Sequence, residues 1–287
     1  MKEVIVLSGK GGTGKTSIVG SFAALAEGAV LADCDVDAAD LHLLLQPAIR
    51  EKHEFWSGQV ATIDESRCTQ CGLCQELCRF KSIRYFKVDR TSCEGCGFCS
   101  HICPSEAITM KENMAGHWFI SDTGYGPLVH ARLGIAQENS GKLVATVRKQ
   151  ARELAEKQKK DYIICDGPPG IGCPVISSLS GANLALLVTE PTLSGIHDLE
   201  RVLDVCHHFG VPAMVCINKY DINGKNTRQI ETYCHDQGAD ILAKIAFDNV
   251  FTEAMVHGMS VVKYSDGTVS RQIMRLWQNI AEILANN

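Results

Sequence analysis

Cysteine is the residue whose spacing in this sequence most clearly indicates chemistry. There are 14 cysteines in 287 residues, and eight of them fall between Cys68 and Cys103 in two runs of Cys-x2-Cys-x2-Cys-x3-Cys. Thiolates at such spacing are ligands for zinc or for iron–sulfur clusters. A disulfide scaffold would be a short, exported chain, whereas residues 1–7 are too short an apolar run for a signal peptide. The cysteines therefore predict metal ligation in a reducing compartment, which we expect to be the cytoplasm.

Each run carries the complete ligand pattern of a 4Fe–4S cluster. In the bacterial two-cluster ferredoxin spacing, three close cysteines bind one cluster and the fourth cysteine of each run crosses to the other. One departure is that Arg79 follows Cys78, whereas Pro104 follows Cys103. Two zinc sites, each held by four thiolates, are the alternative, because zinc needs only paired Cys-x2-Cys spacings. The predicted ligand sets for two 4Fe–4S clusters are Cys68, Cys71, Cys74 and Cys103, and Cys78, Cys93, Cys96 and Cys99.

The segment between the two cysteine runs is basic. Residues 79–90 contain five basic side chains against the single carboxylate of Asp89. Positive charge near a cluster favours its reduced state and can attract an acidic electron partner. A solvated hairpin face is the other interpretation of the same residues. The five basic side chains are those of Arg79, Lys81, Arg84, Lys87 and Arg90.

A glycine-rich turn near the N-terminus is the second chemical signature. It fits G-x-x-x-x-G-K-[ST] at every fixed position and lies between an expected strand at 3–7 and an expected helix at 15–27. Glycines let backbone N–H groups surround phosphates, and the helix N-terminus adds partial positive charge. We expect Lys15 to contact the β- and γ-phosphates and the Thr16 hydroxyl to bind Mg²⁺. The expected nucleotide-binding residues of this turn are Gly9, Lys10, Gly11, Gly12, Thr13, Gly14, Lys15, Thr16 and Ser17.

Polar turns follow several later strands. Asp33, Asp35 and Asp37 lie within five residues, and such a group needs either a cation, which Mg²⁺ at the adjacent phosphates would supply, or wide exposure to solvent. A solvated acidic turn is therefore the alternative. Residues 166–170 read Asp-Gly-Pro-Pro-Gly after another strand, and residues 218–221 read Asn-Lys-Tyr-Asp, the letters of the guanine-reading motif of GTPases.

Lys10 is a second lysine in the glycine-rich turn, which an ordinary phosphate loop does not need. With it, the turn resembles the deviant Walker A signature of the MinD/Mrp and nitrogenase iron protein superfamily of ATPases. The resemblance implies ATP rather than GTP, and a homodimer or a heterodimer with a related ATPase in which Lys10 reaches the nucleotide of the partner subunit. A solvated loop lysine is the alternative for this residue.

The same resemblance implies roles for residues after the later strands. Asp35 would orient the attacking water, and Asp166 would hold the Mg²⁺ shell. These two residues would be catalytic together with Lys10 and Lys15. The N–H of Gly170 would sense the γ-phosphate. The residues implied to lie near the base are Asn218, Lys219 and Asp221.

Cys173 differs from the other cysteines that lie outside the two runs. It stands seven residues after Asp166, the offset of a cluster ligand in the nitrogenase iron protein. The resemblance therefore allows a third cluster or metal held by two facing copies of Cys173 in a dimer. Four other cysteines lie in apolar strand or helix patterns and are expected in the core, namely Cys165, Cys206, Cys216 and Cys234.

The alternation of strands and helices predicts the fold. Short apolar strands followed by helices indicate an α/β protein with a doubly wound, mostly parallel sheet covered on both faces, which agrees with the P-loop fold that the resemblance implies. Residues 58–114, where no long periodic segment is expected, would be an inserted ferredoxin-like domain, flanked by ATPase segments at 1–57 and 115–287. The expected strands are 3–7, 29–33, 162–165, 184–189, 213–218 and 241–246, and the expected helices are 15–27, 40–45, 142–159, 194–208, 227–237 and 270–285.

Composition excludes several classes of function. The 28 basic and 33 acidic residues give a formal charge of −5, so neither nucleic acid nor a membrane is expected as a partner. No apolar run approaches the roughly 20 residues that span a bilayer. The stripe of apolar residues on the last expected helix carries only Arg271 and Arg275 as basic residues, so we expect it to pack in the core.

Three functions fit these features. The first is an ATPase whose nucleotide cycle gates low-potential electron transfer through two 4Fe–4S clusters to a redox partner. The second is an assembly or carrier ATPase that delivers a cluster or metallocofactor to an apo-metalloprotein. The third is an organiser that binds ATP, dimerises and recruits partners without redox turnover.

Overall fold

The computed structural model describes residues 1–134 and 140–286, which divide into two compact units. The first unit comprises Met1–Lys52, Trp118–Ala131 and the chain from Ser140 onward, and the second comprises His53–His117 and residues 132–134. The second unit contains all eight cysteines of the two runs. The finer domain boundaries at 58 and 114 stay a prediction.

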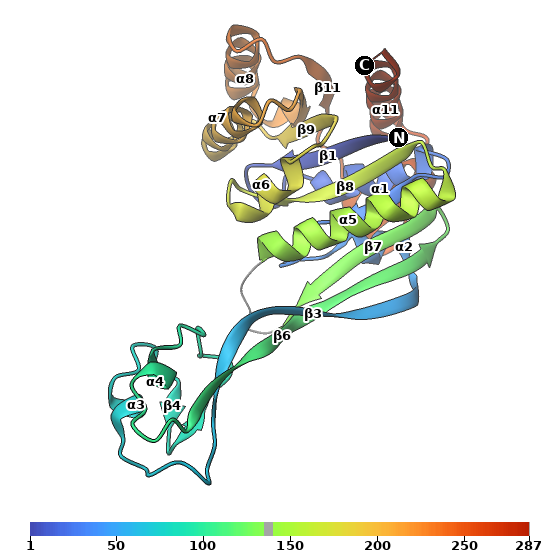
Figure 1. Ribbon diagram of the computed structural model, residues 1–287. Coiled ribbons are helices and arrows are strands. Elements are labelled where there is room, and N and C mark those ends of the chain that lie inside the picture. Colours follow the sequence, from blue (N-terminus) through green and yellow to red (C-terminus); the bar gives the residue numbers. More distant parts are fainter. Residues whose placement is uncertain (135–139, 287) are drawn as a thin grey trace. The chain divides into compact units, whose positions relative to one another are not determined.

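Parallel strands form the centre of the first unit (Figure 1). Within the described residues, nine strands make one sheet in the order β11-β10-β9-β1-β8-β2-β7-β6-β3. From β11 to β7 every neighbouring pair is parallel, so the expectation of a mostly parallel sheet is confirmed. The strands of this sheet are β1 (Lys2–Ser8), β2 (Val30–Asp33), β3 (Ala48–Ile63), β6 (Ile108–Thr123), β7 (Gly126–Leu133), β8 (Tyr162–Pro169), β9 (Leu184–Thr189), β10 (Ala213–Asn218) and β11 (Ile241–Ile245).

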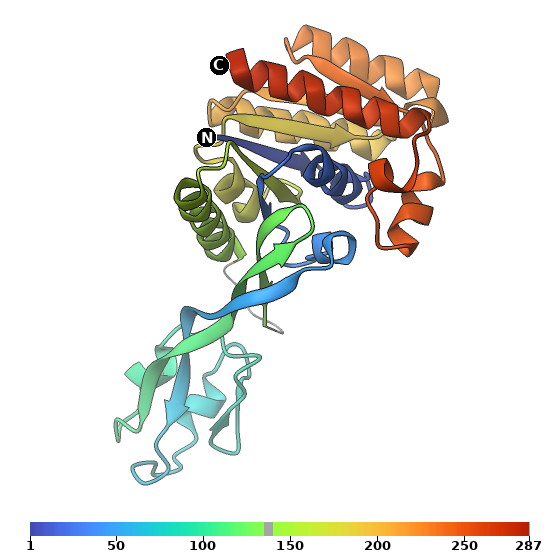
Figure 2. The same cartoon turned by 90° about the vertical axis from the view of Figure 1, so that its right-hand side faces the viewer.

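Helices cover both faces of the parallel strands, as Figures 1 and 2 show. Residues 4–7 of β1 are fully buried, because successive side chains point to opposite faces and each face has a helical layer. Val4 and Val6 pack in one apolar cluster with α1 and α11. The helices are α1 (Lys15–Leu25), α2 (Leu41–Leu45), α3 (Leu73–Glu76), α4 (Phe98–His101), α5 (Ser140–Gln158), α6 (Cys173–Leu179), α7 (Leu193–His208), α8 (Gly224–Asp236), α9 (Val250–Val256), α10 (Val261–Tyr264) and α11 (Thr268–Asn286), with a 3-10 turn at Tyr220–Ile222.

The last helix packs in the core of the first unit, as expected. The Trp277 ring lies 5.2 Å from the Phe22 ring of α1 and meets Tyr162 edge-on at 5.6 Å between centroids. Such aromatic contacts stabilise a core beyond the area they bury. Across the described residues, no helix has the length and apolar character needed to cross a bilayer.

The prediction that residues 58–113 lack a long periodic element is wrong at both ends of that segment. Strands β3 and β6 each run for 16 residues, through Ala48–Ile63 and Ile108–Thr123. The first half of β3 is almost entirely exposed, and its residues 50–54 are polar or charged, so this half shows no apolar alternation. Strand β7 and helices α6, α9 and α10 were also not predicted, because each is short or lies in an irregular stretch.

Candidate functional site

A cavity of about 470 Å³ opens beside the glycine-rich turn of the first unit. The turn lies between β1 and α1, where the sequence predicted it. The cavity brings this turn together with Asp35, Asn218 and Lys219, which come from the ends of two other strands. Residues of the turn that line it are Gly11, Gly12, Thr13, Gly14, Lys15, Thr16 and Ser17.

The backbone of the turn requires glycine at two positions. Gly12 and Gly14 have φ values of +81° and +89°, a region that side chains with a Cβ rarely adopt. A Cβ at Gly14 would also collide with the Asn218 side chain, whose Nδ2 donates a 2.7 Å hydrogen bond to the Thr13 carbonyl. The buried Thr13 hydroxyl has no hydrogen-bond partner among the described residues. An incoming phosphate oxygen would satisfy it.

Lys15 is the buried cation of the site. Its Nζ lies 2.5 Å from an Asp166 oxygen and 3.8 Å from an Asp35 oxygen, and the lysine side chain is only 6% exposed. Burial opposes the charge of Lys15, but Asp166, Asp35 and Asp33 outweigh it and raise the pKa of the ammonium group. The structure thus brings Lys15 together with Asp35 and Asp166, which are three of the four residues predicted to be catalytic.

The three carboxylates after β2 differ in environment. Burial, together with Asp166, raises the pKa of Asp33 well above its usual value, and its carboxylate accepts hydrogen bonds from the backbone N–H groups of Asp35 and Leu41. Burial also raises the pKa of Asp35 to about 6, although Lys15 opposes that shift. Asp37 is exposed. Asp35 is therefore the carboxylate of this turn that lines the cavity, and its pKa is raised to about 6.

Lys10 does not line the cavity and contacts residues that follow β9. Its Nζ lies 2.6 Å from a Glu190 oxygen and within 3.1 Å of the Thr192 and Ser194 hydroxyls. Glu190 also pairs with Lys219 at 2.8 Å. Burial disfavours the charge on Glu190, but hydrogen bonds from the two lysines lower its pKa. Glu190 was not singled out from the sequence, because a lone carboxylate in a loop carries no motif.

The other residues expected at the nucleotide make internal contacts. The N–H of Gly170 donates a 2.9 Å hydrogen bond to the Ser8 carbonyl. Asp221 accepts a 2.7 Å hydrogen bond from the N–H of Phe247 and does not line the cavity. The far wall of the cavity instead comes from a segment after β11 that sequence reasoning missed, Phe247, Asp248, Asn249, Phe251, Thr252 and Met255.

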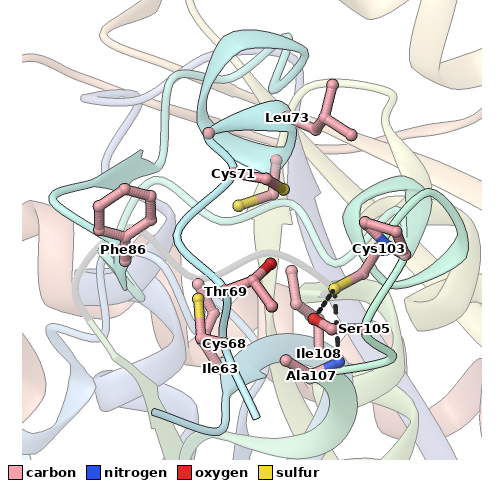
Figure 3. Close-up of a pocket in the computed structure, with 13 residues that line it drawn as sticks. Ile63, Cys68, Thr69, Cys71, Leu73, Phe86, Cys103, Ser105, Ala107 and Ile108 are labelled. Carbon is pink, nitrogen blue, oxygen red and sulfur yellow. Dashed lines mark hydrogen bonds between the residues drawn. The ribbon is translucent and has the colours of Figure 1, made fainter.

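Four predicted ligand cysteines surround a small cavity in the second unit, shown in Figure 3. The cavity measures about 10 Å³, and Leu73 and Phe86 are among its apolar lining residues. A backbone N–H, that of Ala107, donates to the Cys103 sulfur at 3.3 Å. The four cysteines are Cys68, Cys71, Cys74 and Cys103, which are the first predicted ligand set.

The remaining four cysteines surround a second, larger cavity of about 340 Å³ in the same unit. Cys74 lines both cavities, so the two sites share a wall. Leu77, Phe80 and Phe98 contribute apolar surface to the second cavity. The four cysteines are Cys78, Cys93, Cys96 and Cys99, the second predicted ligand set.

The two cysteine runs have matching backbone geometry at an offset of 25 residues. Gly72 and Gly97 have positive φ and directly precede the short helices α3 and α4. Gln70 has a positive φ of 56° where the second run has Gly95 at 62°. Each run therefore folds the same way around its three closely spaced cysteines.

Hydrogen bonds and burial act differently on these thiols. Burial raises the pKa of Cys74 and Cys99, and neighbouring cysteines raise each further. Burial also opposes ionisation of Cys78, but hydrogen bonds from Ser82 lower its pKa, and the Ser82 hydroxyl lies 3.2 Å from its sulfur. The Ser105 hydroxyl lowers the pKa of Cys103.

A single metal ion has a different geometric requirement from a cluster. Within the residues that the structure describes, no three His, Cys, Asp or Glu side chains converge on one ion-sized position. Each thiolate of a 4Fe–4S cluster binds a separate iron, so its sulfurs stand farther apart than the ligands of one ion.

Five cysteines lie outside the two runs and the acidic turn that contains Cys34, and they divide as expected. Cys165, Cys206, Cys216 and Cys234 are buried, and Cys173 is exposed. Cys173 opens helix α6. Its role as a ligand shared between two protomers stays a prediction.

Known proteins resemble this chain over most of its length. The CobQ/CobB/MinD/ParA nucleotide binding domain matches residues 4–261. The uncharacterized protein MJ0578 of Methanocaldococcus jannaschii is 34% identical over 227 residues, which are 78% of this chain and 80% of that protein.

Two further relatives extend the comparison. The iron-sulfur cluster carrier protein of Pyrococcus horikoshii is 27% identical over 158 residues, which are 50% of this chain and 53% of that protein. Among solved structures, the septum site-determining protein MinD complexed with Mg-ADP from Pyrococcus horikoshii OT3 superposes with a TM-score of 0.57 at 18% identity, covering 98% of this chain and 96% of that one. The structural likeness shows a shared fold.

Proposed function

Because this chain belongs to the CobQ/CobB/MinD/ParA family of nucleotide-binding domains, we propose that it is a Mg²⁺-dependent ATPase whose nucleotide cycle controls electron transfer through two 4Fe–4S clusters. The observation that carries the proposal is the gathering of eight cysteines into two sets of four around two cavities, in a chain that also carries a complete phosphate loop.

The residues around the 470 Å³ cavity fit a nucleoside triphosphate with Mg²⁺. The orphaned Thr13 hydroxyl and the N–H groups of the turn would contact phosphate oxygens. Lys15 would exchange part of its contact with Asp166 for the β- and γ-phosphates, and the Thr16 hydroxyl would join the Mg²⁺ shell. Asp166 would then face Mg²⁺ as well as Lys15, so the buried negative charge of Asp166 would stay compensated.

Asp35 is the residue suited to position the attacking water. Its pKa of about 6 means that the carboxylate is ionised at neutral pH and can accept a proton or a hydrogen bond from water. Lys15 lies 3.8 Å away and holds it at the edge of the cavity. ATP is favoured over GTP because Asp221, which would read guanine, is engaged with the backbone of Phe247.

The two cysteine cavities fit 4Fe–4S clusters by their donor sets. Each cavity is lined by its complete predicted set of four cysteines, with Cys74 of the first set also lining the second cavity. N–H or O–H groups lie next to the sulfurs of Cys78 and Cys103. Such hydrogen bonds stabilise thiolate charge and tune a cluster's potential. When bound, the clusters supply one-electron transfer at low potential. The first cavity is the smaller of the two, so the proposal of a cluster there depends on its four cysteine sulfurs and not on the volume of the cavity.

Iron analysis and ATP hydrolysis test this function together. Anaerobically purified protein should contain about eight irons and eight sulfides per chain and should hydrolyse Mg-ATP slowly. A Cys71→Ser, Cys96→Ser variant, one change in each set, should lose most of its iron, whereas the control Cys206→Ser, at a buried cysteine of α7, should keep it. Zinc in place of iron, or iron that survives the double change, would refute the cluster assignment.

A cluster carrier is the second candidate, and one observation favours it. Cys71 and Cys96 are exposed, so a cluster bound there could be reached by an accepting protein, and a relative from Pyrococcus horikoshii is an iron-sulfur cluster carrier protein. Incubation with an apo-ferredoxin distinguishes the two functions. Transfer of iron that depends on nucleotide supports the carrier, and iron that stays on this chain through repeated redox cycles supports electron transfer.

A further inference from the structure

The structure carries a strongly basic hairpin beside the first cysteine cavity. Strands β4 (Ile83–Arg84) and β5 (Lys87–Val88) pair antiparallel, with Tyr85 and Phe86 as the two-residue tip. We propose that this hairpin is the docking surface for an acidic redox protein, which exchanges electrons with the clusters. The inference rests on the proposed function. The hairpin surface consists of Arg79, Lys81, Arg84, Tyr85, Lys87 and Arg90.

Charge is the first observation. All five basic side chains of the hairpin surface are exposed, and none forms an ion pair within the described part of the chain. The lone acid of the segment, Asp89, accepts hydrogen bonds from Thr91 and Ser92 at 2.7–3.0 Å and so stabilises its own turn. The segment therefore presents a concentrated positive charge to solvent in a chain whose formal charge is −5.

The cross-strand pairing concentrates that charge at the hairpin tip. Arg84 and Lys87 lie directly opposite each other in the β4–β5 register. Like charges in that position destabilise a hairpin. The arrangement costs stability within the folded chain, and a carboxylate-rich partner surface would relieve it.

The backbone of the tip is also unfavourable for its residues. Tyr85 and Phe86 have φ values of +50° and +58°, as a type I′ turn requires, and such turns strongly favour asparagine and glycine. Each residue costs of the order of 1 kcal/mol in that region. Two aromatic residues are thus held where smaller residues would be more stable, the kind of local strain that clusters at functional sites.

The two aromatic side chains have different surroundings. Phe86 lines the first cysteine cavity (Figure 3), and Tyr85 is 88% exposed. The N–H of Tyr85 donates a 2.8 Å hydrogen bond to the Gln75 side chain of α3, the helix that carries Cys74. The tip is therefore bonded to the helix that carries Cys74, and a partner that contacts Tyr85 would lie next to Phe86, a lining residue of the cavity.

Apolar contact surface lies beside the charges. Leu77 and Phe80 are 48% and 41% exposed and also line the second cysteine cavity. Phe80 lies between the basic residues Arg79 and Lys81 in the sequence, and exposed apolar side chains next to charged ones are typical of a transient protein interface. Nucleic acid would use the same charges and could stack on the exposed Tyr85 ring, but it would not exchange electrons with a cluster bound in the cavities that Phe86 and Phe80 line. The observations favour an acidic protein.

Binding of an acidic flavodoxin to the full, anaerobically purified chain tests the proposal. The hairpin variant Arg84→Gln, Lys87→Gln should weaken flavodoxin binding, measured by isothermal titration calorimetry, about tenfold at low ionic strength, and added salt should shrink that difference. The matched control Lys149→Gln, Lys157→Gln removes two exposed charges of α5 and should bind like the original chain.

A second variant separates docking from folding. Tyr85→Asn removes the exposed aromatic ring and places a residue that tolerates positive φ at the tip. It should raise the thermal midpoint of the second unit and still weaken flavodoxin binding several-fold. In the reaction itself, one electron passes from the reduced flavin, which is oxidised, to a cluster, which is reduced, and no bond breaks. Its rate should fall with the affinity, whereas the rate with dithionite should not change.

Three results would overturn the proposal. One is equal flavodoxin binding by the hairpin variant and the α5 control. Another is binding that does not depend on salt. The third is a hairpin variant that loses affinity for a DNA oligonucleotide but keeps its affinity for flavodoxin. Iron content measured on the same samples keeps the two failures apart, because a chain without iron refutes the proposed function, and an iron-loaded chain that ignores the hairpin changes refutes only the docking surface.

Discussion

Single residues of the nucleotide site are arranged around one buried cation. Lys15 is 6% exposed and faces Asp166 and Asp35, and Asp33 is buried at the end of β2. Three acids against one lysine leave an excess of negative charge that Mg²⁺ would balance. The raised pKa values of Asp33 and Asp35 express the same imbalance, since burial and neighbouring carboxylates both favour the protonated acid.

Asp35→Asn should stabilise the nucleotide-free protein near neutral pH. The pKa of Asp35 is about 6 in the folded protein against 3.8 for an unperturbed aspartate. The folded state therefore binds the proton more tightly, and Asp35 costs stability as pH rises from about 4 to about 6, on the order of 2–3 kcal/mol in all. Urea midpoints should favour the variant at neutral pH and converge with those of the parent as the pH falls toward about 4.

The same variant should lose hydrolysis. Without a carboxylate to orient water, ATP turnover should fall about 100-fold or more while nucleotide binding persists. Asp37→Asn, at an exposed position of the same turn, is the control and should leave both properties close to those of the parent. Wild-type turnover by the Asp35 variant would remove this residue from the mechanism.

Lys10→Ala should impair assembly more than nucleotide binding. Lys10 is held by Glu190, Thr192 and Ser194 of its own chain, and contact with a partner's nucleotide requires those bonds to be exchanged for phosphate contacts. Sedimentation with a non-hydrolysable ATP analogue should show a dimer weakened about tenfold or more, with the affinity of each protomer for nucleotide changed little. Unaltered dimerisation would identify Lys10 as an ordinary loop lysine.

Elements built from regular patterns could be predicted from the sequence, and the others could not. The bounds of β9 and β10 match the expected strands, because their side chains are almost all apolar and buried on both faces of the sheet. Strand β3 escaped prediction because its exposed half reads Arg-Glu-Lys-His-Glu and carries no alternation. An alternation of apolar and polar residues arises only where one face of a strand is buried, so a strand exposed to solvent on both faces shows no alternation.

The residues of the candidate sites also divide into those that the sequence could predict and those that it could not. The phosphate loop and the cysteine runs were predictable because their chemistry fixes residue types at short spacing. Glu190 and the segment at 247–255 reach the nucleotide cavity region only through the fold, from positions far along the chain. Asp221 fits a base-reading motif but holds the backbone of Phe247. A four-letter match cannot distinguish a ligand contact from a contact within the protein.

Gly95→Ala should disrupt the second cysteine run, and Gly72→Ala should be mild. Both glycines have positive φ, but a Cβ at Gly95 would collide with the Gln59 carbonyl, whereas a Cβ at Gly72 meets open space. The change at Gly72 should cost about 1 kcal/mol, and the change at Gly95 considerably more. Iron per chain after anaerobic reconstitution should drop toward about four for Gly95→Ala only. Equal iron in the two variants would contradict the assigned backbone role.

At the scale of the whole molecule, each compact unit holds one kind of site. The nucleotide cavity is lined by residues of the first unit and both cysteine cavities by residues of the second. The second unit includes many exposed apolar side chains, among them Leu73, Leu77 and Phe98. Because a small unit with little core gains stability from bound metal, we expect the fold of the second unit to depend on the proposed clusters.

Chelation of iron should therefore unfold the second unit selectively. Hydrogen exchange after removal of iron should show loss of protection through 53–117, while β1, β8 and β9 of the first unit, whose cores are fully buried, should exchange as slowly as before. Global loss of protection would mean that the first unit depends on the clusters as well. Retained protection in 53–117 would mean that the fold of the second unit does not need metal.

The proposed function requires one chain to join a triphosphate site to two cluster sites, each of which responds to the other. Electron paramagnetic resonance of the reduced, anaerobic protein, recorded with and without Mg-ATP, tests it most directly, with Mg²⁺ alone as the control. We expect signals from two 4Fe–4S clusters, and we expect their shape or midpoint potential to shift when Mg-ATP is added. Folded protein without such signals, or signals that Mg-ATP leaves unchanged, would contradict it.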